Sequence, residues 1–383
     1  IKGSSGQIIS FIRPDSKGRI WIGSTTPFVD KKNNGGLTYF ENDKFTVFDS
    51  TNFPLDNATD FIETPYGDLI FNSSGRNTRT FEGAYLALYK SGKFVRVDES
   101  MGITLKGAMF FPDALRSSVD KEGNTWMAFN GGSFVIETAN NSGVLMYDGN
   151  KFYQFTDFMK QLKSGQRPLQ VYYSKNLNKL FLSTFFFDGE LFNTNNKIIY
   201  EFDNGKWKPS DMLRGIDDFK DLRSGKTIND FRFTNALFTK PNKYFPEFFV
   251  LPGTIEDQSS KYPDQMFSLS KEKMVKFDAL NGFYGSEIDD GVLLNTSKGF
   301  GIYYPNYSRM LTKKDGLLLT QSGITNLYAD QDGFVWISYS YSEIPDYART
   351  ENVGVNVWDG VKLRTITEED GLSGNTSFRT YQD

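Results

Sequence analysis

The stretch Pro14-Asp15-Ser16-Lys17-Gly18-Arg19-Ile20-Trp21-Ile22-Gly23-Ser24 contains a tight Asp/Gly turn, followed by a short apolar strand with an aromatic residue at its centre. A similar stretch returns around Trp126 and again around Trp336. A motif that returns at intervals of several tens of residues is typical of repeat architectures. The chain is therefore expected to consist of repeated units rather than of unrelated domains.

Each repeat shows four short runs of alternating apolar and polar residues, here called strands a to d, with turn residues between them. The first repeat has expected strands at 7–13, 19–24, 36–40 and 45–48, and the seventh at 323–329, 334–338, 354–358 and 362–366. Strand a is expected at 114–119 in the third repeat and at 228–234 in the irregular fifth. A four-stranded meander repeated about seven times predicts an all-β fold, a seven-bladed β-propeller of four-stranded antiparallel blades over residues 1–366.

The aromatic residues of the b strands have an expected structural role. A four-stranded blade cannot bury both faces alone, so it packs on its neighbours. The residues expected between blades are Trp21, Trp126, Phe181, Phe249 and Trp336. We assign them no function in binding or catalysis.

Composition restricts the chemistry. The 383 residues include no cysteine and no histidine, which excludes disulfides, thiol nucleophiles, Ser-His-Asp triads and histidine-based metal sites. Any catalysis would use Asp, Glu, Lys, Arg or Tyr side chains, and we expect no cofactor and no metal. The net charge of −4 argues against a nucleic-acid surface, which needs a basic excess.

The repeat resembles the two-component regulator propeller repeat. Residues 15–24 and Gly35-Gly36-Leu37-Thr38-Tyr39-Phe40 match that pattern closely, as do residues 332–338 followed by 354–358. The resemblance implies an extracytoplasmic sensor or interaction propeller, of the kind found in hybrid two-component systems of Bacteroidetes or in related surface and secreted proteins. It also implies a periplasmic, cell-surface or secreted location, and a glycan, small molecule or envelope protein as partner.

The end of the chain begins another repeat. Asp370-Gly371-Leu372 matches Asp315-Gly316-Leu317. Residues 367–383 are therefore expected to start an eighth repeat or to supply a closing strand.

The long b–c loops are the expected binding surface, because a–b and c–d turns on the opposite face are minimal and loops on a rigid scaffold carry function. The richest loop follows Ser338, where tyrosines, carboxylates and an arginine suit a sugar or a peptide. The candidate ligand-binding residues are Tyr339, Tyr341, Glu343, Asp346, Tyr347, Arg349, Arg76, Arg79, Phe81, Phe134 and Glu137. By contrast, Asp330-Gln331-Asp332-Gly333 resembles the start of a calcium loop but lacks the later acidic ligands, so we interpret it as a hairpin turn.

Three functions remain open from the sequence. The first is a non-catalytic sensor or binding propeller. The second is a propeller glycoside hydrolase or lyase that uses carboxylates, Tyr and Arg, which the fold alone does not exclude. The third is a scaffold that binds other proteins. The missing histidine and cysteine and the varied loops favour the first.

Overall fold

The computed structural model describes residues 8–25, 36–48, 52–55, 57–73, 86–105, 108–109, 117–131, 142–163, 166–186, 199–211, 232–233, 237–239, 248–251, 253–254, 265–269, 274–277, 285–288, 291–296, 299–303, 308–318, 324–330, 332–339 and 354–372 of the 383-residue chain. The described residues form antiparallel sheets joined by turns. The helical segments among them are short 3₁₀ turns at η2 (Glu99–Met101), η5 (Asp157–Gln161), η7 (Lys313–Asp315) and η9 (Glu368–Asp370). The described chain is therefore all-β.

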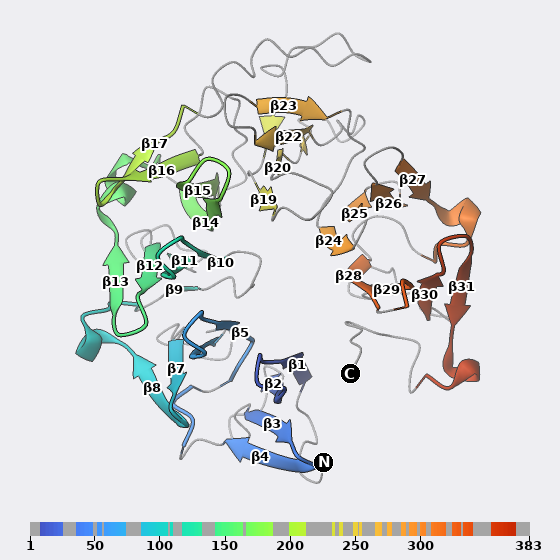
Figure 1. The fold of residues 1–383 in the computed structure, drawn as a ribbon, viewed down its shortest axis with the longest axis horizontal. Helices are drawn as coiled ribbons and strands as arrows, with labels where there is room; N and C mark the ends of the chain where they lie inside the picture. The colour runs from blue at the N-terminus through green and yellow to red at the C-terminus, as the bar shows by residue number, and fades with distance from the viewer. Residues whose placement is uncertain are drawn as a thin grey trace. The chain divides into compact units, whose positions relative to one another are not determined.

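Four meander sheets lie in the first part of the chain (Figure 1). The first sheet comprises β1 (Ile8–Pro14), β2 (Ile20–Thr25), β3 (Leu37–Glu41) and β4 (Lys44–Phe48). The second comprises β5 (Asp60–Glu63), β6 (Leu69–Asn72), β7 (Leu86–Lys90) and β8 (Lys93–Val97). The third comprises β10 (Ser117–Val119), β11 (Thr125–Gly131), β12 (Gly143–Tyr147) and β13 (Phe152–Phe155), with β9 (Ala108–Met109) also paired to β11. The fourth comprises β14 (Gln166–Ser174), β15 (Lys179–Phe186), β16 (Ile199–Asp203) and β17 (Lys206–Pro209).

The later part of the chain continues the pattern. One sheet comprises β19 (Leu237–Thr239), β20 (Phe248–Leu251), β22 (Gln265–Leu269) and β23 (Met274–Phe277), and β18 (Arg232–Phe233) pairs with β21 (Gly253–Thr254). Another comprises β24 (Gly285–Ile288), β25 (Gly291–Thr296), β26 (Gly299–Tyr303) and β27 (Ser308–Leu311). The last comprises β28 (Ile324–Ala329), β29 (Val335–Tyr339), β30 (Val355–Trp358) and β31 (Leu363–Ile366). These four-stranded antiparallel sheets resemble the blades of a β-propeller.

One predicted strand differs from the structure. The first strand of the fifth repeat, expected at 228–234, is instead β19, and β18 pairs separately with β21. The run Leu237-Phe238-Thr239 has the β-forming side chains that this position requires. In the third repeat, β10 lies within the strand predicted at 114–119 and pairs with β11 through Ser118 and Trp126, while residues 114–116 of that prediction lie outside the described residues.

The chain divides into two compact units, residues 1–218 with 234–238 and residues 219–233 with 239–383. In the first unit, consecutive sheets share apolar cores. Successive side chains of β6 belong to two different apolar cores, one on each face of the strand. Leu69 and Phe71 pack in a cluster with Trp21, whereas Ile70 packs in a cluster with Phe129 of the third sheet. This period of two is the expected result of a strand that is buried on both faces.

The tryptophan predictions are confirmed for two of the three residues. The Trp21 ring is fully buried, with ring centroids of Phe71 and Tyr89 of the second sheet at 5.0 and 5.2 Å. Trp126 is also buried, and its nearest ring in the fourth sheet is Phe202, at 4.9 Å. Trp336 of β29 is only half-buried, which corrects the expectation that all three are equally enclosed.

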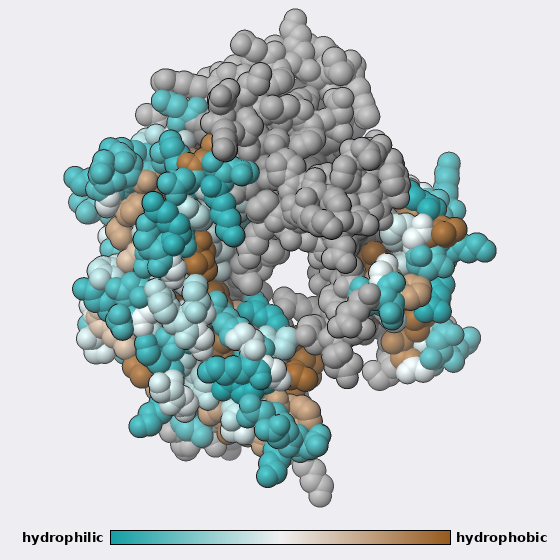
Figure 2. All heavy atoms as spheres, viewed as in Figure 1, coloured by the Kyte–Doolittle hydropathy of each residue, from teal (hydrophilic) through white to brown (hydrophobic). Residues whose placement is uncertain are grey.

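The described surface in the view of Figure 2 is mostly hydrophilic, with smaller hydrophobic areas between the polar side chains. Among the described residues, no helix has both the length and the apolar character that crossing a membrane requires.

Candidate functional site

Tyr339 is an interior residue of its sheet. It ends β29 with 1% of its surface exposed, and its hydroxyl donates a hydrogen bond to Asn356 Oδ1 at 2.5 Å. The sequence predicted Tyr339 as a candidate ligand-binding residue at the start of a long loop; in the structure its side chain packs on the same face of β29 as the buried Val335 and Ile337. The other candidate residues, Tyr341, Glu343, Asp346, Tyr347, Arg349, Arg76, Arg79, Phe81, Phe134 and Glu137, lie outside the described residues.

Asn356 connects the last sheet to the segment that precedes it. The side chain is fully buried, and its Oδ1 also accepts the backbone N–H of Leu318 at 3.0 Å. Its Nδ2 donates to the Gly316 carbonyl at 3.3 Å and to Thr365 Oγ1 at 3.2 Å. A buried amide with partners on both its oxygen and its nitrogen fixes local geometry, so we interpret this cluster as structural.

A repeated aspartate organises the turn between the first two strands of three sheets. Asp15 Oδ1 accepts two backbone N–H groups of its own turn, from Lys17 and Arg19, both at 3.0 Å. Its Oδ2 accepts the indole N–H of Trp21 at 2.9 Å. We call the aspartate and the tryptophan six residues later the Asp–Trp motif.

The same contacts recur in two other turns. Asp120 accepts the indole N–H of Trp126 at 2.7 Å, and Asp330 accepts that of Trp336 at 2.8 Å. Asp330 also accepts the backbone N–H of Phe334 at 2.8 Å, so its carboxylate closes a hairpin turn. The Gly333 N–H also donates to the Asp330 carbonyl at 3.1 Å, so the hairpin turn predicted at residues 330–333 is confirmed for the described residues 330, 332 and 333. Among the described residues, no group of three or more acidic side chains is arranged to hold a metal ion.

The residue four positions after this turn aspartate faces the next sheet. In the first sheet it is Arg19, which is 9% exposed and forms an ion pair of 2.6 Å with Asp15. Its guanidinium carbon lies 5.2 Å from the Trp21 ring centroid, 5.5 Å from that of Tyr39 and 5.3 Å from that of Tyr89, which belongs to the second sheet. Burial alone would raise the pKa of Asp15, but the hydrogen bonds from Trp21 and Arg19 outweigh it and lower that pKa.

At the next sheet boundary the same position holds a carboxylate. Asp68 Oδ2 accepts the hydroxyl of Tyr147, from the third sheet, at 2.8 Å, and Lys90 Nζ lies 3.2 Å from the same oxygen. Burial and the hydrogen bond to Asp68 raise the pKa of Tyr147 to about 12, because both disfavour the phenolate. The polar groups at these first two boundaries are thus paired with one another.

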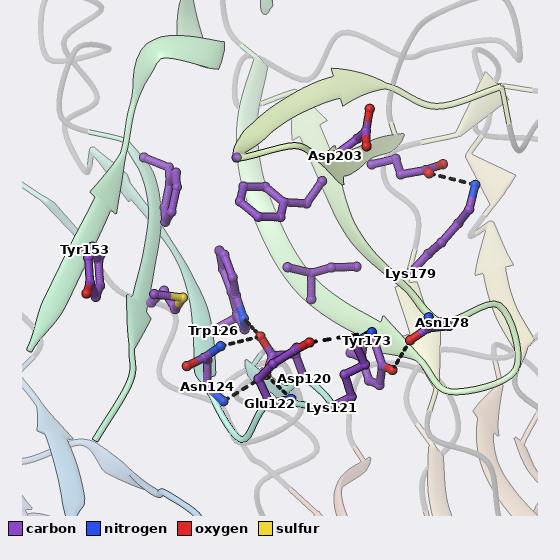
Figure 3. A pocket seen from close by; sticks show the side chains of 16 residues that line it. Asp120, Lys121, Glu122, Asn124, Trp126, Tyr153, Tyr173, Asn178, Lys179 and Asp203 are labelled. Carbon is purple, nitrogen blue, oxygen red and sulfur yellow. Dashed lines mark hydrogen bonds and ion pairs between the residues drawn. The ribbon is translucent and has the colours of Figure 1, made fainter. Parts of the chain in front are cut away.

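At the third boundary an open cleft takes the place of such a pair (Figure 3). The corresponding residue is Asn124, whose side chain bonds back to Asp120 at 2.9 Å. The facing residue of the fourth sheet is Phe202, which has no hydroxyl group to offer. The result is a cavity of about 720 Å³, here called the inter-sheet cleft, between the third and fourth sheets. It is lined by Asp120, Lys121, Glu122, Asn124, Trp126, Met146, Tyr153, Phe155, Tyr173, Asn178, Lys179, Leu180, Glu201, Phe202, Asp203 and Gly205.

The cleft lies at the ends of the sheets that carry the short turns. Its walls include the β10–β11 turn, the β14–β15 turn and the β16–β17 turn. The binding surface predicted from the sequence is at the opposite ends of the sheets, and the prediction did not include this cleft. The available signal was the residue after the glycine in each turn, which changes from Arg19 to Asp68 to Asn124.

Comparisons with known proteins identify no family for this chain. No family model matches the sequence, and no curated protein matches it. The structure is similar to the β-propeller domain of the Trilobed protease from Pyrococcus furiosus over 96% of this chain and 98% of that chain, at 9% sequence identity and a TM-score of 0.47. It is similar to the AfRom2 CNH domain over 88% and 92%, at 10% identity and a TM-score of 0.46. It is also similar to PorZ, a surface component of the type-IX secretion system of Porphyromonas gingivalis, over 92% of this chain and 55% of that chain, at 12% identity and a TM-score of 0.32.

Proposed function

We propose that this chain is a seven-bladed β-propeller that works as a non-catalytic sensor or binding module, and that its ligand is a glycan or an envelope protein. A periplasmic, cell-surface or secreted location belongs to the same proposal and rests on the resemblance to two-component regulator propeller repeats. The observation that carries the binding role is the unequal length of the connections at the two ends of the sheets.

The short connections are close to the minimum for a hairpin. The link between β3 and β4 is Asn42-Asp43, that between β7 and β8 is Ser91-Gly92, and that between β16 and β17 is Asn204-Gly205. In five of the sheets the links between second and third strands are much longer, at 26–36, 73–85, 132–142, 187–198 and 340–354, whereas residues 297 and 298 alone join β25 to β26. Neighbouring strands are antiparallel, so these two classes of link lie at opposite ends of a sheet.

Long, dissimilar connections at one end of a rigid scaffold are the usual place for recognition. Three of them contain the candidate residues, among them Arg79, Tyr341 and Arg349. Tyrosine and arginine are frequent binding anchors, because tyrosine stacks on apolar faces and arginine binds acidic groups with a planar fork. We therefore expect an anionic partner, such as a uronic-acid or sulfated glycan or an acidic protein segment.

The test is a calorimetric screen of acidic glycan fragments and envelope proteins, followed by variants. The double variant Tyr341→Ala/Arg349→Ala is expected to lose binding with its melting temperature nearly unchanged. The matched control Tyr66→Ala/Lys17→Ala removes one tyrosine and one cation from turns at the opposite end and is expected to bind normally. Normal binding by the first double variant would place the site elsewhere, and release of new sugar ends from a bound glycan would contradict a non-catalytic role.

A further inference from the structure

The residues that line the inter-sheet cleft correspond to those that surround the buried Arg19 of the first sheet, but the cleft has no arginine of its own. Around Arg19, the carboxylate comes from Asp15 and the rings from Trp21, Tyr39 and Tyr89. Tyr39 is the cross-strand partner of Trp21 on β3. Tyr89 approaches from the next sheet, and its hydroxyl lies 3.4 Å from the arginine Nη1. This is a complete binding site for a guanidinium group, occupied by the chain's own side chain.

Each of these positions has a counterpart that lines the cleft. Asp120 and Trp126 reproduce the Asp–Trp motif, with the same indole-to-carboxylate hydrogen bond. Met146 is the cross-strand partner of Trp126 on β12, as Tyr39 is of Trp21. Phe202 approaches from the next sheet and stands against the Trp126 ring as Tyr89 stands against that of Trp21.

The occupant itself differs between the two boundaries. Asn124 takes the position of Arg19 but is shorter and uncharged, and its amide turns back to Asp120. Asp120 is half-buried and, among the described residues, forms no ion pair with a cation, whereas Asp15 is nearly fully buried under its arginine. The cleft thus keeps a carboxylate and stacked apolar side chains but lacks the cation that joins them in the first sheet.

The charge around the cleft is also suited to a cation. Its lining includes the carboxylates of Asp120, Glu122, Glu201 and Asp203, against the two lysines Lys121 and Lys179. Lys179 pairs with Glu201 at 2.7 Å, Lys121 with Glu122 at 3.6 Å, and Lys208, which is not part of the lining, with Asp203 at 2.8 Å. Among the described residues, Asp120 is the lining carboxylate without an ion pair, and its negative charge favours a positively charged ligand, more strongly so near the rings, where water is displaced.

We propose that the inter-sheet cleft binds the guanidinium group of an arginine side chain carried by a partner protein. The cleft volume of about 720 Å³ exceeds what one side chain fills, so there is space for flanking residues. Part of its wall is β13, the last strand of its sheet, whose outer edge has backbone groups available to an extended peptide. This site is independent of the proposed function, because it lies at the opposite ends of the sheets from the long connections.

The direct test is calorimetry with three short peptides that differ at one residue, which is arginine, lysine or citrulline. Citrulline has nearly the shape of arginine but no charge. We expect saturable binding of the arginine peptide, weaker binding of the lysine peptide, and at least about tenfold weaker binding of the citrulline peptide, because both the ion pair and the cation–aromatic attraction are lost. Equal affinities for the arginine and citrulline peptides would overturn the proposal. Equal affinities for free L-arginine and the arginine peptide would overturn the assignment to a protein partner.

A variant that fills the cleft provides the second test. Asn124→Arg introduces the residue that the first sheet uses, so it is expected to raise the melting temperature and to weaken arginine-peptide binding at least about tenfold. The control Asn150→Arg adds the same charge at an exposed turn of the same sheet and is expected to leave binding unchanged. Glu201→Gln, which removes one charge from the wall, should weaken binding even if Asn124→Arg folds poorly. Unchanged affinity in both Asn124→Arg and Glu201→Gln would overturn the proposal.

Discussion

The indole N–H of Trp21 donates a hydrogen bond to the carboxylate of Asp15 at 2.9 Å, and this contact joins a turn to the packing between two sheets. The same carboxylate closes the turn through backbone N–H groups and holds Arg19 against the tryptophan ring. One side chain thus connects local turn geometry to the packing of neighbouring sheets. The recurrence of this contact at Trp126 and Trp336 explains why the motif is visible in the sequence.

Loss of the Asp15 charge is expected to change the acid stability of the protein. The pKa of Asp15 in the fold lies below its ordinary value, since hydrogen bonds from Trp21 and Arg19 outweigh the effect of burial. Its contribution to stability is therefore full above its pKa in the unfolded chain, near 4, and is lost as the pH falls through the lower folded value. Asp15→Asn should lower the unfolding free energy at pH 7 and make the decline in acid shallower, as measured by urea unfolding. The control Asp43→Asn changes an exposed turn residue and is expected to lose stability in acid as the wild-type chain does. If Asp15→Asn loses stability in acid as steeply as the wild-type chain, the expectation is contradicted.

The two tryptophans Trp21 and Trp336 are expected to differ in their importance for stability. Truncation of the fully buried Trp21 to alanine removes contacts with two sheets and should cost about 3–5 kcal/mol. Trp336→Ala should cost clearly less, because half-burial leaves a smaller apolar area to be lost. Chemical denaturation of the two variants measures the difference. Equal costs would show that Trp336 is more enclosed than its exposure indicates.

Asn356 should be more important for stability than Tyr339, its hydrogen-bond partner. Asn356→Ala leaves the Tyr339 hydroxyl and the Leu318 N–H without their acceptor, which should cost about 2–4 kcal/mol. Tyr339→Phe removes one donor and keeps the buried ring, so about 1 kcal/mol is expected. The double variant should cost less than the sum of the two, because both single changes break the same hydrogen bond. Strict additivity in denaturation experiments would contradict this coupling.

Alkaline stability should depend on Tyr147. Burial and the hydrogen bond to Asp68 raise its pKa to about 12, with Lys90 acting in the opposite direction. Because the fold favours the neutral form of Tyr147, this residue stabilises the folded chain fully at pH values below its pKa in the unfolded chain, which is about 10. This contribution is lost as the pH rises toward the folded pKa of about 12. Tyr147→Phe should therefore show a shallower loss of stability between those two pH values. Titration by phenolate absorbance checks the assignment: disappearance of a high-pH tyrosine in the variant is the expected result, and an unchanged titration would refute it.

Much of the architecture was predictable because local signals determine it. The Asp-x-x-Gly sequence before Trp21 predicts a hairpin turn, because Asp15 forms hydrogen bonds with backbone N–H groups no more than four residues away. The continuous apolar run Leu69-Ile70-Phe71 of β6 is likewise typical of a strand that is buried on both faces. The irregular fifth repeat was less predictable, because β18 and β19 are only 2 and 3 residues long, and such short runs carry little pattern that distinguishes one from the other.

The individual sites depended on contacts between residues far apart in the chain. Tyrosine is a residue type that is common in binding sites, so Tyr339 was a reasonable candidate from the sequence. Its hydrogen-bond partner Asn356 lies on another strand, and only the packing of the two residues shows that the tyrosine is buried. The sequence by itself determined the repeat, the turns and the buried tryptophans, because these follow from side-chain periodicity and short-range hydrogen bonds. The tertiary structure alone decided that Arg19 fills its boundary while Asn124 leaves a cleft, because that outcome depends on the residue that the next sheet places opposite each of them.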